Sequence, residues 1–237
     1  MTNELLWLIE IIANFLLIIL AYRLFGKWGL ILWIPVSVIL ANIQVVQTIS
    51  LFGFSATLGN VVYATSFLVT DILSENYGRK EAGKAVWIGF FSLISMTLLM
   101  NLTLLFTPLA EDDFSVVTHE SLHTIFSLMP RIAFASLAAY LLSQRHDVWA
   151  FHFWKNRFPE NRHLWIRNNL STAVSQLIDS AIFVVVAFWG VFETAILGEI
   201  FLTTYLLKLV VAASDTPFVY WAKSIYKKEK FLFNHQD

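Results

Sequence analysis

The chain has 237 residues, of which 57% are hydrophobic and 14% charged, against about 45–50% and about 25% in soluble domains. Its formal net charge is −1, so the overall charge points to neither a nucleic acid nor an acidic partner. Cysteine is absent, which excludes disulfides, thiolate catalysis and cysteine-ligated metal. Seven apolar spans of about 20 residues would use roughly 140 residues and leave no room for a soluble catalytic domain.

The hydrophobic residues form seven segments, each long enough to cross a bilayer core about 30 Å thick. In chain order the predicted spans are Leu5–Tyr22, Gly29–Leu51, Val61–Tyr77, Ala85–Phe106, His123–Gln144, Asn168–Trp189 and Ile196–Ala222. The stretch 52–60 is rich in Gly, Ser and Asn and is expected to be an outer loop. No basic region or cleavage site accompanies the first segment, so we expect it to stay in the membrane as an anchor.

Positive charges are sorted between the connections. All but two of the 16 Lys and Arg residues lie in alternate connections, namely Arg23 and Lys27; Arg79, Lys80 and Lys84; Arg145, Lys155, Arg157, Arg162 and Arg167; and Lys223, Lys227, Lys228 and Lys230. The connection 107–122 is acidic and has no basic residue. Because basic connections stay in the cytoplasm, the pattern predicts an all-α polytopic membrane protein with its N-terminus outside and its C-terminus inside.

The remaining two basic residues, Arg131 and Lys208, lie inside predicted spans. Asp71, Asp179 and Lys208 each fall about ten to twelve residues into a span, which is roughly 15–18 Å at 1.5 Å per residue and close to mid-membrane. Arg131 is closer to the outside. A charge that faces lipid at this depth costs about 2.5–3.5 kcal/mol, so these side chains are expected to face the helix bundle. A shared polar cavity would explain all four, whereas a structural ion pair would explain only Lys208 and Asp179.

Polar side chains near these charges extend the candidate cavity. Gln176 precedes Asp179 by three residues, in a stripe of polar residues on one helix face that also contains Asn169 and Thr172. In the last span Thr204, Lys208 and Asp215 share a face, and Asn42 adds an amide near the middle of the second span. The alternative is that such groups only bind neighbouring helices together.

Two residues of the third span have open roles. Phe67 lies one turn before Asp71 and could stack on a flat ligand, although ordinary helix packing is the alternative. Glu75 shares a face with Asp71 but lies near the inner end, so we expect a surface ion pair with Arg79.

The sequence His119-Glu120-Ser121-Leu122-His123 matches the zinc motif of metalloproteases. A catalytic zinc site needs a third protein ligand and a sheltered cavity, and no obvious third ligand follows. Thr118 would instead cap a helix, with Glu120 in its first turn. An intramembrane enzyme is therefore the minor alternative, and we expect no catalytic residue, no metal and no cofactor.

The segment Thr70–Gly78, TDILSENYG, followed by Arg79-Lys80, resembles the signature of the queuosine precursor transporter family, also called the vitamin uptake transporter family. Further matching positions are Arg131-Ile132-Ala133, Ala138-Ala139-Tyr140, Gln144, Asp147-Val148-Trp149, Phe151, Leu170-Ser171-Thr172, Gln176, Asp179, Lys208 and Pro217. The resemblance covers roughly residues 30–225. It departs at Ala64-Thr65-Ser66, where many members have a proline.

This resemblance implies a six-helix core over residues 29–226, an additional N-terminal transmembrane helix over 1–28 and a cytoplasmic tail over 227–237. It implies uptake of a 7-deazaguanine, such as preQ0 or preQ1, across the bacterial cytoplasmic membrane. The family also resembles the substrate-binding subunits of energy-coupling-factor vitamin importers, so a separate ATP-driven partner is the second possibility. The chain itself has no G-x-x-x-x-G-K-[ST] phosphate-binding sequence.

The polar residues suit such a ligand, which presents two adjacent N–H donors, a carbonyl acceptor and a flat ring. A carboxylate accepts from both donors, which fits Asp71 or Asp179. The donor to the carbonyl would be Lys208, Arg131, Gln176 or Asn42. Many other polar heterocycles share this pattern. A purely structural membrane subunit is the remaining alternative, but it would not need opposed charges at mid-depth.

Overall fold

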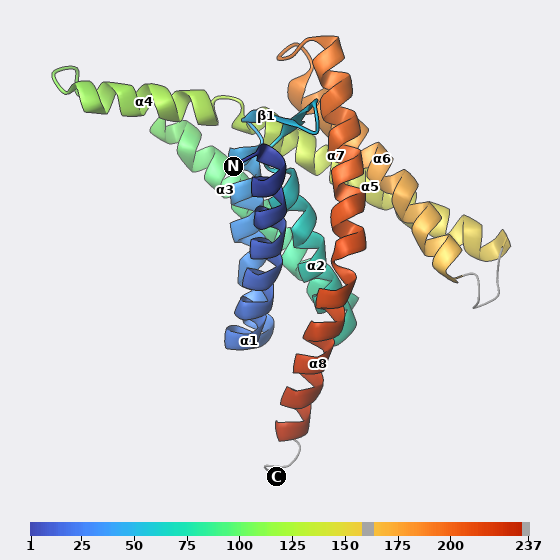
Figure 1. Ribbon diagram of the computed structural model, residues 1–237. Coiled ribbons are helices and arrows are strands. Elements are labelled where there is room, and N and C mark those ends of the chain that lie inside the picture. Colours follow the sequence, from blue (N-terminus) through green and yellow to red (C-terminus); the bar gives the residue numbers. More distant parts are fainter. Residues whose placement is uncertain (158–163, 234–237) are drawn as a thin grey trace.

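The computed structural model describes residues 1–157 and 164–233 (Figure 1). The described elements are α1 Asn3–Gln44, β1 Thr48–Leu51, β2 Phe54–Thr57, α2 Asn60–Tyr77, α3 Arg79–Thr103, α4 Asp113–Phe126, α5 Met129–Arg157, α6 Leu164–Phe188, α7 Thr194–Ser214 and α8 Thr216–Phe233. The fold is thus helical apart from one short hairpin.

The helix α1 is a hairpin of two antiparallel arms, residues 3–25 and 27–44, that reverse at Gly26 (Figure 1). Gly26 has φ 56° and ψ −141°, a backbone conformation open mainly to glycine. The ends of the two arms lie side by side: Gln44 Nε2 donates to Glu10 Oε1 at 3.2 Å, although the two residues are 34 positions apart in the sequence. A Cβ on Gly29 would lie 2.1 Å from the carbonyl oxygen of Ala21, so only glycine fits there. These arms correspond to the first two predicted spans.

The second predicted span was wrong at its end, because residues 48–51 form β1 rather than helix. β1 pairs antiparallel with β2, and the turn residues Phe52 and Gly53 both have positive φ, as two-residue hairpins require. The predicted outer loop is therefore an ordered hairpin. It is attached to α7, since Glu199 accepts from the Ser55 N–H at 2.8 Å and Thr203 donates to the Ser55 carbonyl at 3.0 Å.

The helices α2 and α3 follow as a second antiparallel pair around Gly78, which has φ 90°. α2 matches the predicted span Val61–Tyr77 to within one residue. Its buried face, which includes Leu68 and Ile72, packs against both arms of α1 and forms the largest hydrophobic cluster among the described residues. This cluster sets the position of α2, whose other side chains reach the site described below.

The predicted fifth span His123–Gln144 was wrong at its start. Its first residues belong to a separate helix, α4, and the crossing helix α5 begins only at Met129. The side chain of Asp112, rather than that of Thr118, accepts from the first turn of α4. In Figure 1, α4 extends away from the bundle, while α5 and α6 run side by side as an antiparallel pair.

The predicted last span Ile196–Ala222 is interrupted in the structure. α7 ends at Ser214 and α8 begins at Thr216, with the backbone carbonyl of Asp215 accepting from the N–H of Phe218 at 2.9 Å. Pro217 falls in the first turn of α8, where its missing N–H costs nothing. α8 continues beyond α7 towards the C-terminus (Figure 1).

Within the described chain, four helical stretches are long and apolar enough to cross a membrane: Asn3–Gln44, Lys80–Thr103, Asp113–Ser143 and Thr194–Val211. The predicted fold class, an all-α polytopic membrane protein, is confirmed. The number of crossings, the orientation and the division at residues 28 and 226 stay predictions.

Candidate functional site

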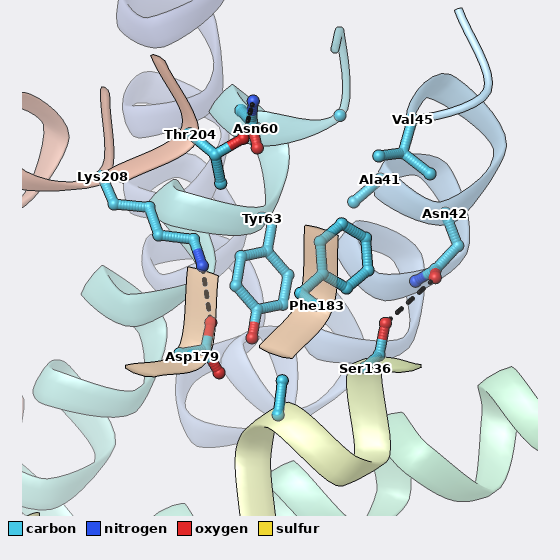
Figure 2. A pocket seen from close by; sticks show the side chains of 12 residues that line it. Ala41, Asn42, Val45, Asn60, Tyr63, Ser136, Asp179, Phe183, Thr204 and Lys208 are labelled. Carbon is cyan, nitrogen blue, oxygen red and sulfur yellow. Dashed lines mark hydrogen bonds and ion pairs between the residues drawn. The ribbon is translucent and has the colours of Figure 1, made fainter. Parts of the chain in front are cut away.

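A narrow pocket lies where α1, α2, α5, α6 and α7 meet (Figure 2). Its lining residues are Ala41, Asn42, Val45, Gly59, Asn60, Tyr63, Ser136, Ala139, Asp179, Phe183, Thr204 and Lys208. The cavity volume is about 30 Å³, room for about two water molecules. A larger guest therefore requires its walls to move.

One wall of the pocket carries a buried ion pair. Lys208 Nζ on α7 lies 2.6 Å from Asp179 Oδ2 on α6, and each residue is only 5% exposed. Asp179 Oδ1 also accepts from Ser143 Oγ at 3.3 Å. The ammonium of Lys208 lies 4.9 Å from the centre of the Tyr63 ring, within the range of a cation–π contact. The ion pair considered in the sequence analysis as the alternative to a shared cavity is thus present, and both of its residues line a cavity.

Two amides line the pocket away from this pair (Figure 2). Asn60 Nδ2 donates to Thr204 Oγ1 at 3.1 Å, which links the start of α2 to α7. Asn42 Nδ2 donates to the Val38 carbonyl at 2.7 Å, and its Oδ1 accepts from Ser136 Oγ at 3.5 Å. Neutral donors and acceptors therefore accompany the ion pair.

Tyr63 and Phe183 supply the aromatic surface of the pocket, with both rings in its centre in Figure 2. The predicted stacking residue Phe67 does not line it. The Phe67 ring instead meets Tyr63 edge-on at 5.6 Å and an interplanar angle of 86°. Phe67 therefore packs against the ring of Tyr63, which does line the pocket.

Asp71 and Arg131 lie elsewhere, so the four charges do not share one cavity. Asp71 is exposed on α2 and is not among the residues that line the pocket. Arg131 donates from Nε and from a terminal nitrogen to the carbonyls of Val186 and Trp189, both at 2.6 Å. A cation at a helix C-terminus satisfies carbonyls that have no partner within the helix, so Arg131 caps α6.

Gln176 lies one turn before Asp179 but is not among the lining residues. Its Oε1 is buried without a hydrogen-bond partner in the described chain, as is the Oγ of Ser180. Both atoms flank Asp179 on α6. The side chains of Asn169 and Thr172, predicted to continue this stripe, lie outside the described residues.

Several lining residues were missed from the sequence, notably Tyr63, Asn60 and Phe183. Helical spacing carried the signal, because Phe183 follows Asp179 by four residues and Tyr63 precedes Phe67 by four. Asn60 was assigned to a loop, although it begins α2. Glu10 was also missed as an acidic residue inside the first arm of α1.

Basic residues at one end of the bundle form ion pairs. Glu81 contacts Lys27 at 2.6 Å and Lys84 at 2.8 Å, and these ammonium groups lower the pKa of Glu81 to about 2. Glu75 forms an exposed ion pair with Lys223 of α8, where the sequence pointed to Arg79.

The metalloprotease motif has no support in the described chain. His119 and His123 lie on α4, and no group of three His, Cys, Asp or Glu residues there could hold a metal.

The family model described as "Putative vitamin uptake transporter" matches residues 57–222. A Bacillus subtilis protein named "Probable queuosine precursor transporter" is 44% identical over 230 residues, which cover 97% of this chain and 99% of that protein. The Escherichia coli "Queuosine precursor transporter" is 28% identical, covering 73% and 74% of the two chains. A Haemophilus influenzae protein named "Probable queuosine precursor transporter" is 28% identical over 58% of this chain and 54% of its own. No solved structure matches the chain.

The family model covers α2 to the first part of α8, and the Bacillus subtilis relative matches nearly the whole length. The family consists of transporters, which agrees with the expectation that the chain is not an enzyme. With its apolar helices and its pocket between them, the chain belongs to the vitamin uptake transporter family of multi-pass membrane proteins.

Proposed function

We propose that this protein imports a queuosine precursor, a 7-deazaguanine such as preQ0 or preQ1, across the bacterial cytoplasmic membrane. The relatives' names support the substrate. The observation that carries the proposal is the buried Asp179–Lys208 pair on the wall of a pocket that also contains two aromatic rings and two amides. The basic connections support the proposed orientation, with the N-terminus outside.

Each group of the pocket has a role in this proposal. The carboxylate of Asp179 accepts from the ring N–H and the exocyclic amine, because only an acceptor with two oxygens meets both donors. Lys208 donates to the ligand carbonyl, and Asn42 offers a second amide contact. Since Asp179 and Lys208 are joined in the structure at 2.6 Å, binding exchanges their mutual contact for contacts with the ligand.

Aromatic stacking supplies affinity for the flat ring. Tyr63 and Phe183 lie on the pocket wall, and stacking on an aromatic side chain is worth about 1–3 kcal/mol per base. The pocket is too narrow for a bicyclic base, so binding includes a movement of the surrounding helices. Gln176, with its buried unpartnered oxygen, comes within reach of the ligand if α6 moves.

The other predicted site residues take supporting roles. Asp71 lies about eight residues, or roughly 12 Å, further along α2 than Tyr63, which suits a position on the exit path rather than in the binding pocket. Phe67 holds the ring of Tyr63, and Arg131 holds the end of α6. In this proposal residues 1–28 are an addition to a core over 29–226, with 227–237 as a cytoplasmic tail.

A separate ATP-driven partner is the alternative mode of energy coupling. Four alanines of α5 are small enough for close contact with such a partner, but Ala133, Ala135 and Ala139 are already buried within the bundle, and only Ala138 is half-buried. Uptake by the purified chain alone would decide between the two modes.

The experiment is uptake of labelled preQ0 and preQ1 into liposomes that contain only the purified chain, with binding measured by thermal shift. Both precursors should raise the melting temperature, guanine less and adenine not at all. The variant Asp179→Asn should lose binding and uptake, whereas Glu120→Gln, the same change on the exposed helix α4, should keep both. Normal uptake by Asp179→Asn, or no response of the wild-type protein to any precursor, would refute the proposal.

A further inference from the structure

The contact between Lys208 and Tyr63 has a geometry that hydrophobic packing alone does not require. Lys208 Nζ lies 4.9 Å from the ring centre of Tyr63 and 2.6 Å from Asp179 Oδ2 (Figure 2). The ammonium thus contacts both a carboxylate and an aromatic ring. The ring is itself oriented by Phe67, which meets it edge-on at 86°.

Ligand binding creates a problem for this ammonium. In the proposed function Asp179 turns to the donors of the ligand, so Lys208 loses its ionic partner while it stays buried. An unpaired buried charge is strongly unfavourable. The ligand carbonyl accepts only one of the three ammonium protons, so a second stabilising contact must remain on Lys208.

The described pocket contains few groups that could provide this contact. Asp179 is the only carboxylate among the lining residues. The neutral oxygens of Thr204, Asn42 and Asn60 could each accept a proton, but none of them accepts from Lys208 in the described structure, so each would have to rearrange. Asp215 lies seven residues further along α7, about 10 Å at 1.5 Å per residue. The face of the Tyr63 ring is already in contact and needs no rearrangement.

We propose that Tyr63 is a positioning residue, whose ring holds the Lys208 ammonium through a cation–π contact while Asp179 releases it to bind the ligand. This inference rests on the proposed function and deepens it, because it names the group that lets the ion pair open. The electron density of the ring face is what matters here, and the phenol hydroxyl is not required.

The test is a graded change of that electron density at constant shape. Position 63 is replaced by phenylalanine and then by mono-, di- and trifluorophenylalanine, which leave the ring size nearly unchanged but weaken its negative face. The measured quantity is the dissociation constant of preQ0, or of preQ1 if that binds more tightly. Tyr63→Phe should bind within about twofold of the wild type. Affinity should then fall stepwise with each fluorine, to about tenfold weaker for the trifluoro ring.

The same fluorinated series at Phe183 is the matched control, because that ring also lines the pocket and stacks on the ligand in the proposed function, but has no cation–π contact with Lys208 in the described structure. Its affinities should stay flat. Flat affinities at position 63 as well would overturn the inference while leaving the proposed function intact. Failure of the wild-type protein to bind any precursor would instead overturn the proposed function, and this inference with it.

Discussion

Removing the charges of the buried pair one at a time and then together tests whether Asp179 and Lys208 bind substrate or only hold α6 against α7. At 2.6 Å and an effective dielectric constant of about 20, their Coulomb attraction is about 6 kcal/mol. Desolvation of both groups offsets much of it. Loss of one partner leaves an uncompensated charge in a site that is 5% exposed, so Asp179→Asn and Lys208→Met should each destabilise the protein by about 3–5 kcal/mol.

The double variant removes both charges, so it should be more stable than either single variant by about 2 kcal/mol or more. Thermal unfolding in detergent gives the relative stabilities, and precursor uptake into liposomes gives function. We expect the double variant to fold well and to transport nothing. Recovery of uptake together with stability would mean that the pair is structural only. Additive losses of stability would contradict the direct contact.

Three further outcomes follow from contacts outside the pocket. Arg131→Met should lower the stability of the protein by about 2–3 kcal/mol, because two carbonyls at the end of α6 lose a charged donor; weaker ligand binding at unchanged stability would restore Arg131 to the binding site. The pKa of Glu81 is about 2, below its ordinary 4.5. The wild type should therefore melt at a higher temperature than Glu81→Gln above pH 4.5, and this difference should disappear as the pH falls towards 2. A difference that does not depend on pH would contradict this. Glu199→Ala should speed hydrogen exchange of the Ser55 amide about tenfold, since that amide loses its acceptor, and unchanged exchange would show that the hairpin is held by other contacts.

The spans that were predicted well are those for which the membrane itself is the constraint. A segment in hydrocarbon must be helical and apolar, because its backbone has no other hydrogen-bond partner. The first arm of α1, which belongs to one of the four apolar stretches, accordingly contains the whole of the predicted span Leu5–Tyr22. The helix α2 lies outside those stretches and still matches its prediction to within one residue.

The errors fall where the chain leaves that constraint. The hairpin of residues 48–57 is hydrogen-bonded to the side chains of Glu4 on α1 and of Glu199 and Thr203 on α7. These partners lie far away in the sequence, so the local residue pattern does not indicate them. The end of α4 overlaps the start of a predicted span, and the break at Asp215 falls within the last one; hydropathy changes little at either place, and local backbone contacts decide the boundary.

By itself the sequence determined the helical membrane class and the family, and it predicted that Asp179 and Lys208 lie at a similar depth in the bundle interior, because a charge that faces lipid is costly. Only the tertiary structure decided which other residues join them. By depth in their predicted spans Asp71 and Arg131 look as costly as Lys208, yet Asp71 is exposed on α2 and Arg131 caps α6. Tyr63 and Phe183 look like ordinary packing residues until α2 and α6 bring them to the same pocket. Depth along a helix can be counted from the sequence, but the direction in which each helix face points depends on the packing of all its neighbours.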